Sequence, residues 1–147
     1  PNGVGRDGNK VPMPNNSVDF VVISETHIAD IEIGDLEKSI TNIESEDFKI
    51  LLSHDPSHWE AEVLPHSQPF HLTLSGHTHG FQFGIEIPGW VKWSPIQWRY
   101  KHWAGVYEEK EQKLNVNRGF GYLAYPGRVG IWPEITVITL KKRNLLI

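Results

Sequence analysis

The stretch "LTLSGHTHGFQFG", residues 72–84, carries His77 and His79 one residue apart, between Gly76 and Gly80. In an extended backbone, residues i and i+2 point to the same face, with attachment points about 6.5 to 7 Å apart. That separation suits two imidazoles that bind two metal ions about 3.5 to 4 Å apart. Because the flanking glycines let the backbone turn sharply, the pattern predicts a metal-binding loop at the end of a strand.

A third histidine follows another apolar run. In "FKILLSHDP" the run of residues 50–52 ends in Ser-His-Asp-Pro, which places His54 directly after a short strand. In α/β sheets, ligands bind in the crevice beyond the carboxyl ends of the strands, so we expect His54, His77 and His79 to converge there. A bare His-x-His also occurs by chance on protein surfaces, but two strand ends that both deliver histidines favour a metal site.

The elements that must position these histidines alternate in type. We expect strands at residues 18–24, 50–52 and 72–74, an amphipathic helix in "GDLEKSITNIESED" and a second helix that begins near Pro56. Further strands are expected at "KLNVNRG" and "EITVITLKK", which makes the second half rich in β-structure. The fold class is therefore α/β, in one domain over residues 1–147, with residues 1–17 as a loop or disordered end.

Composition excludes several classes. The chain of 147 residues has no cysteine, so any metal is held by nitrogen and oxygen ligands. A formal net charge of −4 gives no footprint for nucleic acid. No run approaches the roughly 18 apolar residues of a membrane span, and no secretory signal opens the chain.

Three motifs together resemble a known family. "LLSHDPSHWEAEVLP", "LTLSGHTHG" and "VNRGFGYLAYPGRVGIWPEITVITL" are similar to the C-terminal half of the calcineurin-like metallophosphoesterase superfamily, in its bacterial branch with SGHTHG-type motifs. The resemblance implies part of a four-layer α/β/β/α sandwich. It also implies phosphate-ester hydrolysis by a metal-bound hydroxide at a binuclear site of Mn, Fe or Zn.

The resemblance assigns roles to individual residues. His54 and His77 would ligate the second metal and His79 the first, with Thr78 as a spacer between them. Asn117 and Arg118 match the strand end that follows the metal motif in this branch, where they would be structural or would line the rim of the substrate cleft.

The earlier motifs of the family are missing ahead of His54. The resemblance places the bridging Asp and the acid His in those motifs, so we expect no catalytic residue in this chain and read it as a C-terminal portion that is inactive alone. "SETHIADIEIGD" imitates two of the motifs, but its spacing is too short. Three histidines could still hold one Zn²⁺ with water as the fourth ligand. Missing partner strands would leave exposed sheet edges and so favour self-association.

Aromatic residues crowd the segment "GWVKWSPIQWRYKHWAGVY". Trp90 and Trp93 could form a wall of the substrate cleft, or the whole run could pack a long insertion onto the sheet. The rival function is a non-catalytic, Trp-rich β module that binds carbohydrate or a membrane interface. The sequence leaves open the substrate, which could be a monoester, diester, nucleotide or lipid, and the metal. Localisation is also open, since members of this branch often carry N-terminal membrane anchors.

Overall fold

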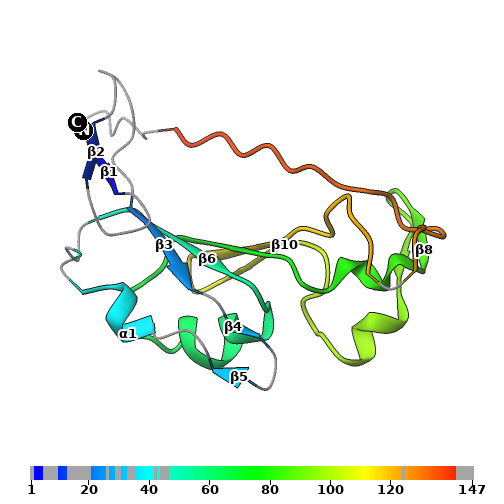
Figure 1. Ribbon diagram of the computed structural model, residues 1–147, viewed down its shortest axis with the longest axis horizontal. Helices are drawn as coiled ribbons and strands as arrows, with labels where there is room; N and C mark the ends of the chain where they lie inside the picture. Colours follow the sequence, from blue (N-terminus) through cyan, green and yellow to red (C-terminus); the bar gives the residue numbers. More distant parts are fainter. Residues whose placement is uncertain are drawn as a thin grey trace.

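A mixed seven-stranded sheet organises the computed structural model (Figure 1). The structure describes residues 2–4, 10–12, 21–25, 27–28, 31–32, 36–41, 43, 47–123 and 125–141. The strands of the sheet, in spatial order, are β10 (Gly105–Glu109), β11 (Gln112–Val116), β7 (Leu72–Ser75), β6 (Lys49–Ser53), β3 (Val21–Glu25), β1 (Asn2–Val4) and β2 (Lys10–Pro12).

The middle of this sheet is parallel. Strands β11, β7, β6, β3 and β1 run in the same direction, and β10 and β2 pair antiparallel at the two edges. Leu52 lies opposite Leu74, and Ser75 lies opposite Val116. The carboxyl ends of β6, β7 and β11 therefore meet at one edge, and the residues that follow these strands are neighbours in space.

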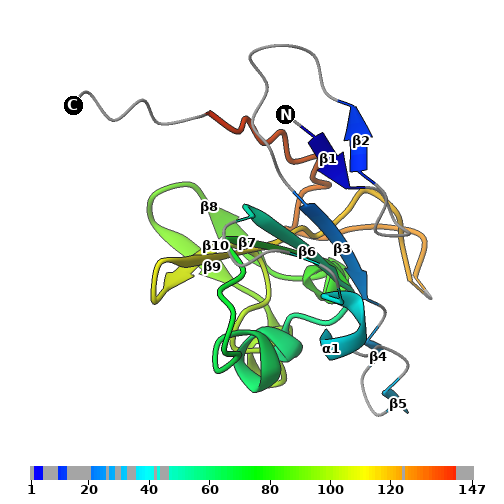
Figure 2. The ribbon, with the colours of Figure 1, turned by 90° about the vertical axis from the view of Figure 1, so that its left-hand side faces the viewer.

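Helical turns cover one face of the sheet. The helix α1 (Leu36–Ser39) and the π-helical turn η1 (Trp59–Val63) lie on the same side of β6 and β3, as Figure 2 shows. Between these turns and the sheet is a buried apolar core, made up of Leu36, Ile40, Leu51, Trp59, Val63, Leu64, Phe70, Leu114 and Val116. Alternate residues of β6 and β11 point into this core, because successive side chains of a strand face opposite sides.

A second, smaller core lies beyond the carboxyl edge. Tyr100, Trp103, Ala104 and Ile131 are buried together there, next to the 3-10 turn η3 (Pro95–Trp98). The hairpin of β8 (Ile85–Ile87) and β9 (Val91–Trp93) belongs to the same region. A further two-stranded pair is formed by β4 (His27–Ile28) and β5 (Ile31–Glu32).

The segment after residue 131 differs from the prediction. "EITVITLKK" was expected as a strand, but residues 132–141 form none and run across the face of the sheet opposite the helical turns (Figures 1 and 2). The side chain of Ile135 is 79% exposed and that of Val137 is 87% exposed. Its alternating pattern fits a half-buried strand, but among the described residues no neighbouring strand pairs with it.

Other expectations have mixed outcomes. The mixed α/β class is confirmed, and the strands expected at residues 50–52 and 72–74 are β6 and β7. Among the described residues of the helix expected in residues 34–47, α1 is the helical part, and Leu36 and Ile40 are buried as the spacing predicted. Within residues 1–17, positions 2–4 and 10–12 are strands, and the rest lie outside the described residues. No described helix has the length and apolar character needed to cross a membrane.

Candidate metal centre

Two strand ends bring His54 and His77 together. The carbonyl oxygen of His54, just after β6, accepts hydrogen bonds from the Ser75 hydroxyl at 2.9 Å and the Gly76 amide at 3.2 Å. These bonds tie the loop after β6 to the loop after β7. The pairing of β6 with β7 therefore fixes the backbone positions of both histidines.

The rings of His54 and His77 meet through their nitrogens. Nε2 of His54 lies 2.8 Å from Nδ1 of His77, and the ring centroids are 4.6 Å apart in an edge-on arrangement. Two nitrogen ligands of one tetrahedral ion, with bonds of about 2.0 to 2.1 Å, lie about 3.3 Å apart. The pair therefore needs to open by only about half an ångström to hold an ion between the two nitrogens.

Burial lowers the pKa of His77 and of His79 and so favours their neutral forms. Burial has the largest effect on the pKa of His77 and lowers it; the nearby charge of Asp55 raises it, and the smaller effects of His54, His79 and Arg99 lower it again, so that the pKa is lowered on balance. Burial, followed by the charge of Arg128, lowers the pKa of His79. Since a metal binds the neutral imidazole, both shifts favour the protonation state that a ligand needs.

The His-x-His loop is not extended, contrary to expectation. His77 and His79 have φ angles of 61° and 50°, with Thr78 in the right-handed region between them. Non-glycine residues occupy this left-handed region at a cost of roughly 1 to 2 kcal/mol each. Thr78 is more than a spacer, because its buried hydroxyl donates to the Trp103 carbonyl at 2.8 Å and accepts from the Gly80 amide.

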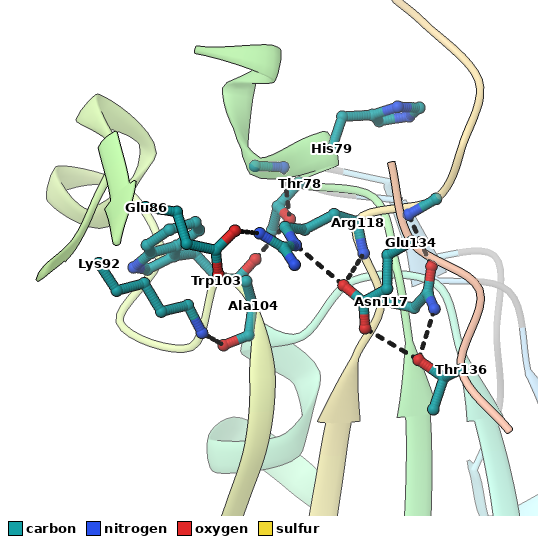
Figure 3. A network of polar contacts seen from close by, with 12 residues as sticks. Thr78, His79, Glu86, Lys92, Trp103, Ala104, Asn117, Arg118, Glu134 and Thr136 are labelled. Atoms are coloured by element: carbon teal, nitrogen blue, oxygen red, sulfur yellow. Dashed lines mark hydrogen bonds and ion pairs between the residues drawn. The ribbon is translucent and has the colours of Figure 1, made fainter. Parts of the chain in front are cut away.

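His79 is held apart from the pair. It begins the 3-10 turn η2 (His79–Gln82), and its carbonyl accepts from Arg128 at 3.2 Å. Figure 3 shows its ring pointing away from Arg118 and Glu134. The Nδ1 atom of His79 is buried without a hydrogen-bond partner, so no described group competes with a metal ion for this nitrogen.

The described residues hold part of a ligand set. Among them, no group of three or more histidine or acidic side chains is close enough to bind a metal by itself. The facing nitrogens of His54 and His77 suit two ligands of one ion, and the Nδ1 atom of His79 is a separate nitrogen without a hydrogen-bond partner. The donor set thus suits a divalent ion that takes further ligands from elsewhere.

A pocket of about 400 Å³ opens beside His54. It lies over the face of the sheet that the helical turns leave uncovered, and its lining includes Leu52, Asn117, Thr136 and Ile138. A bound molecule at this position would therefore contact both the strand ends and the C-terminal segment.

Comparison with curated proteins decides the family. The chain is 36% identical over 117 residues to the uncharacterized metallophosphoesterase YkuE of Bacillus subtilis, which covers 78% of the chain. It is 34% identical over 110 residues, or 74% of the chain, to a transmembrane protein with metallophosphoesterase domain of Danio rerio. It is 29% identical over 92 residues, or 63% of the chain, to phosphodiesterase YaeI of Escherichia coli.

The chain is a relative of the metallophosphoesterases. It spans 39%, 23% and 32% of the lengths of the three relatives, in the order given above. No protein-family model matches the chain, and no solved structure matches it. The relatives therefore identify the superfamily that the sequence motifs indicated.

Asn117 lies at the edge of the pocket beside His54. Its side-chain Nδ2 donates to the Thr136 hydroxyl at 2.7 Å, and its side-chain Oδ1 accepts from the Gly119 amide at 2.6 Å. Asn117 thus lines the same pocket as His54 and also connects β11 to the C-terminal segment. The role of Asn117 at the rim of a substrate cleft stays a prediction.

Arg118 is engaged by two carboxylates. Its guanidinium pairs with Glu134 at 2.9 Å and with Glu86 of β8 (Figure 3). Burial opposes the charged form of Arg118, but the hydrogen bonds that its guanidinium donates to Glu134 and Glu86 outweigh this effect and raise the pKa of Arg118. Arg118 therefore joins the hairpin and the C-terminal segment to the end of β11, which is the structural alternative considered for it.

The aromatic run divides into buried and exposed members. Tyr100 and Trp103 are buried, whereas the side chains of Trp90 and Trp98 are 80% and 79% exposed. Trp93 is partly buried, and its ring contacts that of Trp98 edge-on, with centroids 6.2 Å apart. No described contact joins Trp90 or Trp93 to the three histidines, so the structure does not bring these two tryptophans to the metal centre.

Sequence reasoning did not find two neighbours of His77. The hydroxyl of Tyr100 lies 3.0 Å from His77 Nε2, and a carboxylate oxygen of Asp55 lies 3.9 Å from the same nitrogen. Asp55 stands directly after His54 in the sequence and could have been singled out as a carboxylate at a strand end. Tyr100 gave no such signal, because only the fold of the aromatic segment brings it there.

Proposed function

We propose that this chain is the C-terminal portion of a metal-dependent phosphoesterase domain and that it supplies nitrogen ligands to the metal centre. The observation that carries the proposal is the 2.8 Å approach of His54 Nε2 to His77 Nδ1 at the ends of two parallel strands. The relatives named as metallophosphoesterase and phosphodiesterase support the class of reaction.

Each histidine has a distinct part in this proposal. His54 and His77 hold one divalent ion through the two facing nitrogens, and His79 reaches a second ion. Such ions, when bound, activate water and neutralise the charge that develops on a phosphate group. The carboxylates that complete a binuclear centre would come from the longer part of the protein that the relatives contain and this chain does not span.

The sheet supports a layered architecture for the complete domain. Its helix-covered face is tightly buried, while on the opposite face Leu52 is 37% exposed next to the pocket. In a four-layer sandwich, a second sheet would cover this face, and the alternating residues of the C-terminal segment would pair within that sheet. Residues 1–147 would then be one portion of a single domain.

The proposed substrate is a phosphodiester. The relative from Escherichia coli carries the name phosphodiesterase. The pocket beside His54 is lined by Asn117 and Thr136; the Asn117 side-chain amide donates one hydrogen to Thr136 and keeps its second for a phosphate oxygen. In the proposal, this lining orients the ester while the histidines hold the ions.

Metal content and hydrolysis test the proposal together. The complete polypeptide is purified with Mn²⁺ or Zn²⁺, its bound metal is counted, and hydrolysis of bis(p-nitrophenyl) phosphate is followed. His77→Ala is expected to lose bound metal and to lower hydrolysis by more than the ~100-fold that changes outside the ligand shell reach. His66→Ala is the matched control, because His66 contacts Glu37 instead of the ligand pair.

Two results would contradict the proposal. One is a wild-type protein that binds no divalent metal at all. The other is a His77→Ala variant that keeps both its metal and its hydrolysis while the His66→Ala control behaves as wild type.

A further inference from the structure

A buried tyrosine and a buried carboxylate stand behind the metal-facing edge of His77. The hydroxyl of Tyr100 lies 3.0 Å from His77 Nε2 and 3.4 Å from Oδ2 of Asp55. Tyr100 is 7% exposed and Asp55 is completely buried. The same imidazole therefore has His54 at one nitrogen and a polar chain of two residues at the other.

The two ring contacts of His77 fit either tautomer, and the contact of Tyr100 with Asp55 favours one arrangement of the hydrogens. An ionised carboxylate only accepts hydrogen bonds, so the single hydroxyl hydrogen of Tyr100 goes to Asp55. The tyrosine oxygen then accepts from His77, which must carry its hydrogen on Nε2. The lone pair on Nδ1 of His77 then faces His54 Nε2 and accepts its hydrogen in the metal-free protein; a metal ion would take the place of that hydrogen between the two nitrogens.

Asp55 cannot orient His77 directly. Its oxygen lies 3.9 Å from His77 Nε2, which is beyond hydrogen-bond distance. Tyr100 lies between them and bridges the gap. The hydroxyl is therefore the group that passes the orienting effect of the carboxylate to the ring.

Both members of the chain are held firmly. The other carboxylate oxygen of Asp55 accepts from the Ser57 amide at 2.8 Å and from the Ser57 hydroxyl at 2.6 Å. The Tyr100 amide donates to the Ile96 carbonyl at 2.9 Å, and the Arg99 guanidinium lies over the Tyr100 ring. The aromatic segment thus has a structural link to the ligand pair, which the sequence alone did not indicate.

We propose that Asp55 and Tyr100 are positioning residues that fix the tautomer and orientation of His77, so that its Nδ1 is presented for metal binding. The inference rests on the proposed function, since it assigns a role to residues behind a proposed ligand. Hydrogen bonds to the second nitrogen of a ligating histidine commonly set its tautomer and its basicity as a ligand.

The test compares two tyrosine variants. Tyr100→Phe removes the bridging hydroxyl and keeps the ring in its core. Tyr107→Phe is the matched control, because its hydroxyl also makes a partly buried hydrogen bond, to the Ala104 carbonyl at 3.0 Å. Both are made in the complete polypeptide, and thermal unfolding verifies that they are folded.

Two readouts are measured on each variant. The first is the dissociation constant for Zn²⁺, obtained by competition with a chromophoric chelator. The second is the tautomer of His77 in the metal-free protein, obtained from the ¹⁵N chemical shifts of its ring nitrogens. The second readout needs no bound metal and no activity.

The proposal predicts that Tyr100→Phe weakens Zn²⁺ binding by about 10- to 100-fold and adds the Nδ1–H tautomer to the wild-type Nε2–H form. Tyr107→Phe leaves both readouts unchanged. Asp55→Asn also weakens Zn²⁺ binding. The double variant Asp55→Asn/Tyr100→Phe binds Zn²⁺ no more weakly than the weaker-binding single variant, because both changes break the same chain of hydrogen bonds.

Unchanged affinity and an unchanged tautomer in Tyr100→Phe would overturn the inference. If the wild-type protein binds no Zn²⁺, the proposed function fails, and the His77 tautomer still decides whether Tyr100 orients the ring. A wild-type tautomer with hydrogen on Nδ1 would also overturn the inference.

Discussion

Gly130 should be among the positions least tolerant of a side chain. Its φ angle is 68°, and a Cβ atom added there would lie 1.9 Å from the backbone oxygen of Gly84. The two backbones are fastened at this crossing, because the Gly84 amide donates to the Val129 carbonyl at 2.9 Å and the Val129 amide donates to the Gln82 carbonyl at 2.8 Å. The crossing holds the turn after His79 in place.

The size of the effect follows from three contributions. A left-handed φ costs an alanine about 1 to 2 kcal/mol. The overlap with a backbone atom costs about 1 to 3 kcal/mol more. Alanine also lowers the conformational entropy of the unfolded chain, which stabilises the fold by about 0.4 to 1 kcal/mol. Gly130→Ala should therefore destabilise the fold by about 1 to 4.5 kcal/mol.

Two other glycines separate these contributions. Gly119 has a φ angle of 67° but open space around its Cβ position, so Gly119→Ala should cost only about 0 to 1.5 kcal/mol. Gly121 has open space as well and no left-handed φ, so Gly121→Ala should be neutral or stabilising by up to about 1 kcal/mol.

Urea unfolding followed by circular dichroism measures all three variants, since a shift of the midpoint at constant slope reports stability. The expected order of destabilisation is Gly130→Ala, then Gly119→Ala, then Gly121→Ala. Equal losses for Gly130→Ala and Gly119→Ala would refute the reasoning, because the backbone overlap would then contribute nothing.

Three further changes test the core and the charged groups. Leu114→Ala should cost about 2 to 5 kcal/mol in urea unfolding, because Leu114 is fully buried, whereas the exposed Leu123→Ala should stay within about 0.5 kcal/mol. Burial disfavours the charged form of Glu134, but the hydrogen bond that Arg118 donates lowers the pKa of Glu134 below 4.5. The wild-type protein should therefore lose stability as the pH falls through that lower pKa, and Glu134→Gln should not show this loss. Burial lowers the pKa of His71 below 6.5, so thermal melts should show stability falling as the pH drops below 6.5 in wild type, and less so in His71→Gln.

The sequence predicted that His54 and His77 lie close together at one edge of the sheet. Both follow apolar runs, and adjacent parallel strands carry the residues after their carboxyl ends to one edge. The 2.8 Å approach of their nitrogens also depends on which strands are neighbours and on the left-handed φ of His77. The strand order itself was not predictable from single strands, since it depends on how the whole sheet assembles.

The conformation of the His-x-His loop was not predictable. A pattern of alternating residues suggests an extended backbone, but His77 and His79 both adopt left-handed φ angles. The reason lies in contacts distant in sequence, such as the bond from the Thr78 hydroxyl to the Trp103 carbonyl. Tyr100 was missed for the same reason, because its position depends on the packing of the aromatic segment.

The C-terminal segment shows the limit of periodicity. The alternation in "EITVITL" is that of a strand with one buried face, yet Ile135 and Val137 are exposed and pair with no described strand. A pattern can predict which side of a segment should be buried, but a strand forms only where a neighbour supplies the hydrogen bonds.

The most direct test of the metal centre is a crystal structure of the complete polypeptide grown with Mn²⁺, with anomalous diffraction to locate the ions. The account predicts an anomalous peak about 2.0 to 2.3 Å from both His54 Nε2 and His77 Nδ1, at the edge where β6 and β7 end. A peak at other residues, or no peak at these two nitrogens under saturating Mn²⁺, would contradict it.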